Sequence, residues 1–390
     1  MLIDILLYIG VGVAAYWAVA AFYLAGEDLS AFDRPTGERF SSGPEPSTEL
    51  KAVVASLSGI RAALHGVPFR KRTLALRKYM DEAFADRHLD ASFAPVDCAG
   101  VPGEWVLAPG ADSARRTLYI HGGAYLMGSP RSHRTLTSAF SDLTGGAVLA
   151  IGYRLMPEHR RMAGIEDCRT AYRWMLEHGP NGVEAARTVF VAGDSAGGNL
   201  TLSLIAWVRD QGLRAPDAAV ALSPATDSTL ASPSLKANVA TDAMLGPMFG
   251  KLTKVPKAVL LWLGWLQNRM IPRNPAISPV YGDLSNLPPV LVHASEVEML
   301  LDDSRRYVNR AQAAGSPVTL QTWNHMIHVW QIFNPELTEA REALEEIRKF
   351  LAAAAPPGAA RGSLGPPGEP VAVAGPATLR QSVHALDTDH

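Results

Sequence analysis

The sequence has few cysteines and no surplus of either charge. Only Cys98 and Cys168 occur among 390 residues. Two cysteines exclude a disulfide scaffold and a zinc site built from cysteines, and we interpret both as buried thiols. Lys and Arg total 36 against 38 Asp and Glu, which gives a formal net charge of −2. Because a nucleic-acid-binding protein needs a basic surplus, this balance argues against nucleic acid as a partner.

Charged residues are missing from one stretch near the N-terminus, residues 5–26. As a helix with a rise of 1.5 Å per residue, this stretch would be about 33 Å long, which is enough to cross a bilayer core of ~30 Å. A cleaved signal peptide usually has a basic start and a shorter apolar run, whereas the only charged side chain before this run is Asp4. We therefore predict a membrane anchor over residues 1–27 rather than a signal peptide or a buried helix.

The predicted orientation of this anchor depends on two arginines. No Lys or Arg precedes the apolar run, while Arg34 and Arg39 follow it. Basic residues are enriched in the cytoplasmic segments that flank a membrane helix. This asymmetry favours a cytoplasmic position for the rest of the chain.

After the anchor, the periodicity of the sequence changes. Residues 28–92 are expected to form the first, helical part of a cap. Over residues 93–355, short β-rich runs alternate with helical segments, which is typical of an α/β fold with a mostly parallel sheet and helices on both faces. Residues 228–275 interrupt the alternation and are expected to form a second cap segment. Residues 356–390, with 6 Pro and 5 Gly in 35 residues, are predicted to be a disordered tail.

The motif Gly193-Asp194-Ser195-Ala196-Gly197 lies between a predicted strand and a predicted helix. In this context G-x-S-x-G forms a sharp turn that exposes the serine hydroxyl above the sheet. The N-terminus of the following helix favours developing negative charge. Ser195 is therefore predicted to be a nucleophile.

A second motif, His121-Gly122-Gly123-Ala124, directly follows the predicted strand RTLYI. Backbone N–H groups in such a loop can stabilise the oxyanion of a tetrahedral intermediate. We expect Gly122 and Gly123 to supply two donors and Ala196 to supply a third. A plain glycine-rich turn is the alternative, but the loop follows the strand where a hydrolase needs it.

The base that activates Ser195 is expected after it in the chain, in the order serine, acid, histidine. His325 and His328 lie between the last predicted strand and the last helix, and His328 is preferred because it directly precedes the helical segment. His293 lies within a predicted strand and is interpreted as a core residue. A metal site at His325 and His328 lacks further spaced ligands, so no metal or organic cofactor is expected.

Four acidic residues follow the predicted strand PPVLVHAS and are candidates for the acid. Asp302 and Asp303 are expected in the first turns of a helix, where acidic residues complement the helix dipole. Glu296 and Glu298 lie nearer the end of the strand, where a side chain can face the histidine. Spacing alone does not separate these two glutamates.

Together, these motifs resemble the bacterial hormone-sensitive-lipase-like esterases of the α/β-hydrolase superfamily. The resemblance spans residues 93 to 352. The segments that carry it are HGGAYLMGS (121–129), YRLMPEHR (153–160), GDSAGGNL (193–200), LLDDS (300–304) and HVW (328–330).

This resemblance implies a serine esterase for short-to-medium acyl or acetyl esters, with an α/β-hydrolase fold and a two-part helical cap. It implies Ser195 as the nucleophile, His328 as the base and Glu298, four residues before Asp302, as the acid. Two positions depart from the family pattern, since Ala124 replaces a glycine and many members carry Asp at the acid position. The anchor is not part of the common pattern, although arylacetamide deacetylases are relatives that carry one.

Two other functions stay open at this point. One is a lactone hydrolase, amide hydrolase or deacetylase of the same fold, because a fold does not determine its substrate. The other is a catalytically silent, membrane-tethered binding module, which would predict a broken triad or oxyanion loop. The sequence does not indicate an oligomeric state.

Overall fold

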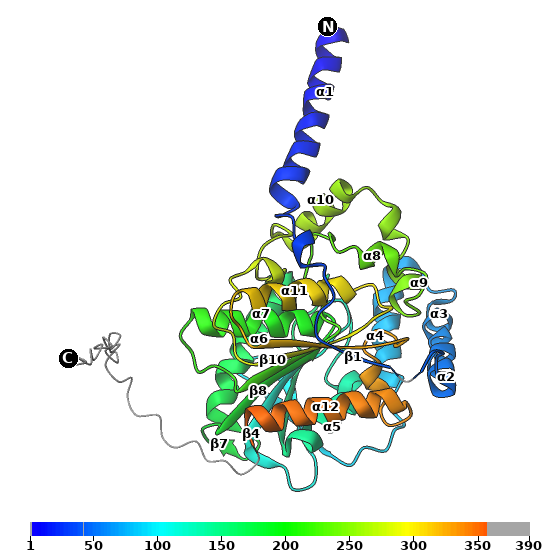
Figure 1. Ribbon diagram of the computed structural model, residues 1–390. Helices are drawn as coiled ribbons and strands as arrows, with labels where there is room; N and C mark the ends of the chain where they lie inside the picture. Colours follow the sequence, from blue (N-terminus) through cyan, green and yellow to red (C-terminus); the bar gives the residue numbers. More distant parts are fainter. Residues whose placement is uncertain (1, 42, 357–390) are drawn as a thin grey trace, which may run out of the picture. The chain divides into compact units, whose positions relative to one another are not determined.

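The computed structural model describes residues 2–41 and 43–356, which belong to one compact unit. A nine-stranded sheet lies at its centre in the order β1-β11-β10-β9-β8-β4-β5-β3-β2 (Figure 1). Apart from Pro356, the predicted tail lies outside the described residues. The strands of the sheet are β1 (Glu38–Phe40), β2 (Ser92–Asp97), β3 (Pro102–Leu107), β4 (Asp112–Ile120), β5 (Gly146–Ile151), β8 (Thr188–Asp194), β9 (Ala218–Leu222), β10 (Val290–Ser295) and β11 (Val318–Trp323).

Most neighbouring strands of this sheet run parallel, as predicted. Strand β3 is the exception, since it pairs antiparallel with both β2 and β5. The central strands β5, β8 and β9 are buried along their whole length. Their uninterrupted apolar runs follow from this position, because a strand covered on both faces has no solvent side for polar residues.

Helices cover both faces of the sheet (Figure 1). Helices α6, α7 and α11 contribute Ile165, Leu204 and Val308 to the core on one face, and α5 and α12 contribute Phe140 and Ile347 to the core on the other. The prediction of a sheet between two helical layers is therefore confirmed. The bounds are α5 (Arg134–Thr144), α6 (Arg161–Glu177), α7 (Ala196–Asp210), α11 (Leu301–Ala313) and α12 (Thr338–Ala354), and a small hairpin joins β6 (His178–Gly179) to β7 (Gly182–Val183).

The expectation that residues 28–92 belong wholly to a helical cap is wrong in part. Strand β1 lies within this range and pairs parallel with β11 at the edge of the sheet, where Phe40 stacks on Trp323 at 4.4 Å between ring centroids. Three residues are too few to show the alternation of a strand. The helices in this range are α2 (Thr48–Ser56), α3 (Ser58–Leu64) and α4 (Arg72–Glu82).

Residues 228–275 contain short helices instead of the βα alternation, which agrees with the prediction for this range. They are α8 (Ser234–Ala237), α9 (Leu245–Phe249) and α10 (Lys257–Asn268). The role of these helices as a cap stays a prediction.

The apolar N-terminal stretch forms α1 (Leu2–Val19) and continues as the π-helix η1 (Ala20–Leu24). Over Leu7–Leu24 its mean hydropathy is 1.7, and only 11% of these residues are buried. Among the described residues, this is the one helix whose length and composition suit a membrane span.

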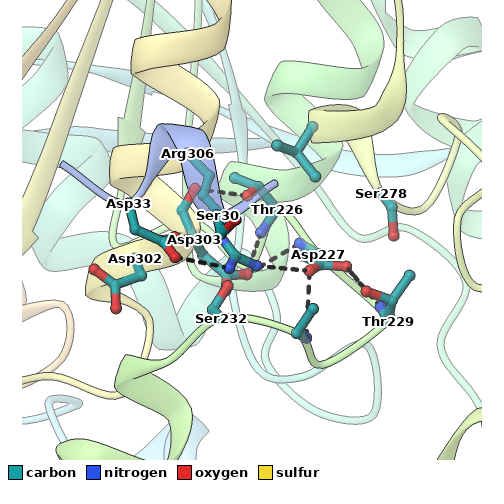
Figure 2. A network of polar contacts seen from close by, with 12 residues as sticks. Ser30, Asp33, Thr226, Asp227, Thr229, Ser232, Ser278, Asp302, Asp303 and Arg306 are labelled. Atoms are coloured by element: carbon teal, nitrogen blue, oxygen red, sulfur yellow. Dashed lines mark hydrogen bonds and ion pairs between the residues drawn. The ribbon is translucent and has the colours of Figure 1, made fainter. Parts of the chain in front are cut away.

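A buried polar network fastens the segment after α1 to α11 (Figure 2). Arg306 of α11 donates from Nε to Asp33 Oδ1 at 2.5 Å, and its Nη1 lies 3.7 Å from Asp227 Oδ2. Asp303 Oδ2 accepts the backbone N–H groups of Thr226 and Asp227, at 2.8 and 3.0 Å, and Oδ1 accepts Ser232 Oγ at 2.5 Å. Three segments that are distant in sequence therefore meet at the start of α11.

The pH dependence of stability offers a test of this network. Burial and the negative charge of Asp227 raise the pKa of Asp303 from 3.8 to about 7. Between these values the unfolded chain has lost the proton that the folded chain retains, so stability falls as pH rises. We expect Asp303→Asn, whose amide fits the same partners and carries no charge, to gain stability relative to the parent from pH 4 to pH 7, on the order of a few kcal/mol. Urea unfolding across this range measures the difference, and a constant difference would contradict the expectation.

Candidate functional site

Ser195 lies in a strained turn between β8 and α7, with φ 53° and ψ −114°. Its backbone N–H donates to Leu222 O at 2.7 Å. The turn passes so close to β4 that a Cβ on Gly197 would lie 1.9 Å from Ile120 O, and one on Gly193 would lie 2.6 Å from the same oxygen. Both glycines of the G-x-S-x-G motif are therefore required by close backbone contact.

The predicted nucleophile, base and acid meet at the carboxyl ends of three parallel strands. Ser195 follows β8, Glu298 follows β10 and His328 follows β11. Ser195 Oγ lies 2.8 Å from His328 Nε2, and His328 Nδ1 lies 2.7 Å from Glu298 Oε2. This chain of hydrogen bonds has the geometry by which a carboxylate orients an imidazole and the imidazole accepts a proton from a hydroxyl.

The contacts of the two glutamates differ, although their spacing did not distinguish them. Glu298 is fully buried, and its second oxygen accepts the N–H of Ser295 at 2.9 Å. The Glu296 carboxylate instead pairs with Arg305 at 3.0 Å. Of the two, Glu298 is the one in contact with His328.

His328 lies beside a carboxylate that favours its charged form. Burial alone would lower the pKa of His328, but the hydrogen bond to Glu298 and the charge of Glu298 outweigh burial and raise it. An imidazolium formed at His328 would therefore be stabilised without contact with bulk water.

The expectation that Gly122 donates to an oxyanion is wrong. Its N–H already donates to Asp194 Oδ1 at 3.1 Å, and Gly122 does not line the cavity next to Ser195, whereas Gly123 and Ala124 do. Within the described part of the chain, the N–H groups of Gly123 and Ala124 have no hydrogen-bond acceptor. A sequence motif fixes the loop, but the direction of each N–H depends on φ, and Ala124 adopts a left-handed φ of 54°.

Sequence reasoning also missed the contacts behind Ser195. Asp194 accepts a hydrogen bond from Tyr119 at 2.9 Å, and its Oδ2 lies 3.3 Å from His133 Nε2. Burial would lower the pKa of His133, but the charge and hydrogen bond of Asp194 raise it. His133 belongs to no motif in the sequence, so only the folded chain reveals that it lines the cavity.

A cavity of about 370 Å³ opens above Ser195 and His328. Its wall includes residues of α3 and α4 as well as α9, so both predicted cap segments contribute to it. Phe249 lines this cavity, whereas Trp262 and Trp265 pack around the end of the N-terminal helix. The other apolar residues of the wall include Leu57, Ile60, Leu76, Met80, Phe84, Met244 and Met248.

A metal site at His325 and His328 was weighed in the sequence as an alternative and not predicted. Within residues 2–41 and 43–356, no group of three or more His, Cys, Asp or Glu side chains is placed to hold a metal ion. His293 is buried between Trp323 and Trp330 and bonds Gln321 at 2.9 Å, which agrees with its interpretation as a core residue.

Known proteins resemble this chain in both sequence and fold. A family described as alpha/beta hydrolase fold matches residues 117–332. An acetyl-hydrolase of Streptomyces hygroscopicus is 40% identical over 249 residues, covering 64% of this chain and 78% of that protein. An esterase of Acinetobacter venetianus is 32% identical over 256 residues, covering 66% and 80%. A crystal structure of an esterase from the bacterial hormone-sensitive lipase family matches with a TM-score of 0.69 and 35% identity, covering 80% of this chain and 99% of that one.

The close contact at the serine turn predicts opposite effects for two glycine substitutions. In Gly197→Ala the new Cβ would overlap the Ile120 carbonyl, so we expect a loss of about 1–3 kcal/mol or more in the free energy of unfolding. In Gly264→Ala, within α10, the Cβ meets nothing within 4 Å, and we expect a gain of roughly 0.5–1 kcal/mol. Urea unfolding of both variants measures these changes. Equal stability of the two would contradict the close packing of the turn.

Proposed function

The chain belongs to the bacterial hormone-sensitive-lipase family of the α/β-hydrolase fold and is a carboxylic ester hydrolase, and we propose that it forms an acyl-enzyme on Ser195. One observation carries this proposal: the hydrogen bonds from Ser195 through His328 to Glu298, of 2.8 and 2.7 Å, at the floor of an apolar cavity. The strained turn at Ser195 adds support, because it presents Oγ to that cavity.

In the proposed first step, Ser195 Oγ attacks the ester carbonyl while His328 Nε2 takes its proton. The C–O bond of the ester then breaks, and His328 returns the proton to the departing alcohol. In the second step His328 takes a proton from water and the resulting hydroxide attacks the acyl carbon. The bond from this carbon to Ser195 Oγ then breaks, the carboxylic acid leaves, and His328 returns the proton to Oγ. Throughout, Glu298 holds the Nδ1–H tautomer and stabilises the imidazolium.

Three backbone N–H groups are proposed to bind the oxyanion of the tetrahedral intermediates. They belong to Gly123, Ala124 and Ala196, with Gly123 and Ala124 lining the cavity and Ala196 starting helix α7. Such donors are fixed before the substrate arrives and stabilise charge that develops only in the transition state. The N–H of Gly122 donates to the Asp194 carboxylate instead, which supports this set of donors.

The proposed substrates are short-to-medium acyl or acetyl esters. The cavity has a volume of about 370 Å³ and is lined by leucine, methionine and phenylalanine side chains. Pockets of this kind recognise ligands by apolar burial with a few polar groups at the reacting end.

We further propose that α1 and η1 anchor the protein to a membrane. The uncharged helix over Leu7–Leu24 is mostly exposed, and exposed side chains such as Leu7, Ile9 and Phe22 are apolar. A surface of this kind is stable in lipid and unfavourable in water.

Substitutions in the proposed triad test the mechanism. We expect Ser195→Ala to lower kcat by about 10⁴-fold or more and Glu298→Gln by roughly 10²–10⁴-fold, with the fold retained. The matched control is Glu296→Gln, which removes a nearby carboxylate that contacts Arg305 and should leave kcat within about threefold. Hydrolysis of p-nitrophenyl butyrate measures these rates.

A fluorophosphonate probe provides the complementary readout. Mass spectrometry should find the adduct on Ser195 in the parent and none in Ser195→Ala. A parent protein that neither hydrolyses esters nor reacts with the probe would be the silent binding module, and the mechanism would be refuted.

The pH profile tests the role of His328, because only its neutral form can accept the proton. Glu298 raises the pKa of His328 above the ordinary value of 6.5, so kcat/KM should fall as pH decreases through that raised pKa. In Glu298→Gln the charge is gone, and the acidic limb should move to lower pH. A limb that stays in place in this variant would assign the ionisation to another group.

A further inference from the structure

Acidic residues are missing from a long stretch around α10. Between Asp242 and Asp283 the chain has forty residues, 243–282, without a single Asp or Glu. The same stretch has five basic residues, although the whole chain has a net charge of −2. We call residues 243–282 the basic segment. Its cations are Lys251, Lys254, Lys257, Arg269 and Arg273.

All five cations are exposed. No carboxylate of a described residue lies within 4.0 Å of any of them. Many other basic side chains outside this segment do form an ion pair, such as the pair of Arg77 with Glu158. Arg273 bonds an uncharged group, since its Nε donates to Tyr23 O at 3.0 Å. Within the described fold the five cations therefore form no ion pair, and only Lys257 has carboxylates, those of Asp227 and Asp28, near enough to act on its charge.

Exposed leucines lie among these cations. Leu252, Leu263 and Leu266 have exposed fractions of 48, 54 and 47%. Leu263 and Leu266 are three residues apart in α10 and so share one face. The other side of α10 is also apolar, and there Ala258 and Leu261 are buried against η1. Helix α10 is thus apolar on both sides and flanked by cations at both ends.

The contact between α10 and the N-terminal helix sets the position of this surface (Figure 1). Trp262 stacks on Tyr16 at 5.5 Å between ring centroids, and its Nε1 donates to Tyr16 O at 3.3 Å. Tyr16 precedes Val19, the end of α1, by three residues, or about 5 Å of helix. If the 18 residues of α1, about 27 Å of helix, cross the bilayer, η1 lies at the headgroups, and α10, which packs against η1, lies there too.

We propose that the basic segment docks on the anionic headgroups of the bilayer into which α1 inserts. Leu263 and Leu266 enter the boundary between headgroups and acyl chains, and the lysines and arginines bind lipid phosphates. This docking rests on the proposed anchoring by α1, but not on the proposed catalytic residues. Because α9 belongs to the basic segment and lines the cavity, the part of the chain that touches lipid also forms a wall of the active site.

A second copy of the chain fits this surface less well. Self-association through α10 would bury Leu263 and Leu266, but it would bring together ten cations that form no ion pair, with no acidic residue from either basic segment. Like charges at such an interface oppose association. An anionic lipid surface satisfies both the apolar and the charged groups.

A fluorescent label on α10 tests docking in the full-length protein. Cys98 and Cys168 are free and buried, as predicted, so Leu266→Cys provides one reactive thiol for an NBD dye. The protein is reconstituted into vesicles of phosphatidylcholine alone or with 30% phosphatidylglycerol. We expect the anionic vesicles to shift NBD emission to the blue and doxyl-labelled lipid to quench it. The matched control is Val183→Cys on β7, which is 84% exposed and should show neither effect.

A pair of charge variants tests the electrostatic part. In the Leu266→Cys background, Lys251→Gln with Lys254→Gln should weaken docking about fivefold for each charge removed. Arg348→Gln with Lys349→Gln removes the same charge from α12, where both cations already pair with glutamates, and should have little effect. Raising the salt to 1 M should weaken docking of the parent, because screening shortens to ~3 Å.

Two results would overturn the docking. One is a label at position 266 that stays unquenched in anionic vesicles while the protein remains in the membrane after carbonate extraction. The other is a blue shift that depends on protein concentration and not on phosphatidylglycerol, which would identify a second copy as the occupant. Release of the protein from the vesicles by carbonate would refute anchoring by α1, and docking with it. Ester hydrolysis measured in parallel tests the catalytic proposal independently of both.

Discussion

The close approach of the serine turn to strand β4 is the constraint on which the site depends. At Gly197 there is no room for a side chain between the turn and the Ile120 carbonyl. In the same turn Ser195 has a positive φ of 53°, a conformation that non-glycine residues rarely adopt. The strain has a structural consequence, because the hydroxyl is turned out of the sheet toward His328 while the next residue begins helix α7. In the proposed mechanism this hydroxyl acts together with backbone N–H groups, and a looser turn would separate them.

Asp194 makes the serine turn and the glycine-containing loop one unit. Its carboxylate accepts from Gly122 on the loop and from Tyr119 on β4, and it lies beside His133, which also lines the cavity. Burial would raise the pKa of Asp194, but the positive charge of His133 and the hydrogen bonds outweigh burial and lower it. An ionised carboxylate can hold all three partners. The loop is consequently fixed relative to Ser195 before any substrate binds, which is the property that an oxyanion site requires.

The sequence predicts those parts of the site that depend on local patterns. Ser195 and His328 could be found because a strand, a short motif and a helix follow one another there, and parallel strands bring such ends to one edge. Glu298 could not be separated from Glu296 by the same reasoning, since the choice depends on how the turn after Ser295 directs two neighbouring side chains. Gly122 was assigned wrongly because its N–H is bonded by a residue 72 positions away. Strand β1 was missed because three residues carry no period and its partner β11 is distant in the chain.

Average composition conceals where the charges of this protein lie. A net charge of −2 indicates no strongly charged partner, yet forty consecutive residues contain only cations among their charged side chains. The remainder of the chain must therefore be more acidic than the average, and the fold packs α10 and Arg273 of this segment against the end of the apolar N-terminal helix. Coulomb attraction to a charged surface decays within about 10 Å at ordinary ionic strength. Within that range a nearby surface experiences the charge of the basic segment and not the net charge of the whole chain. The local charge therefore favours an anionic partner at the basic segment.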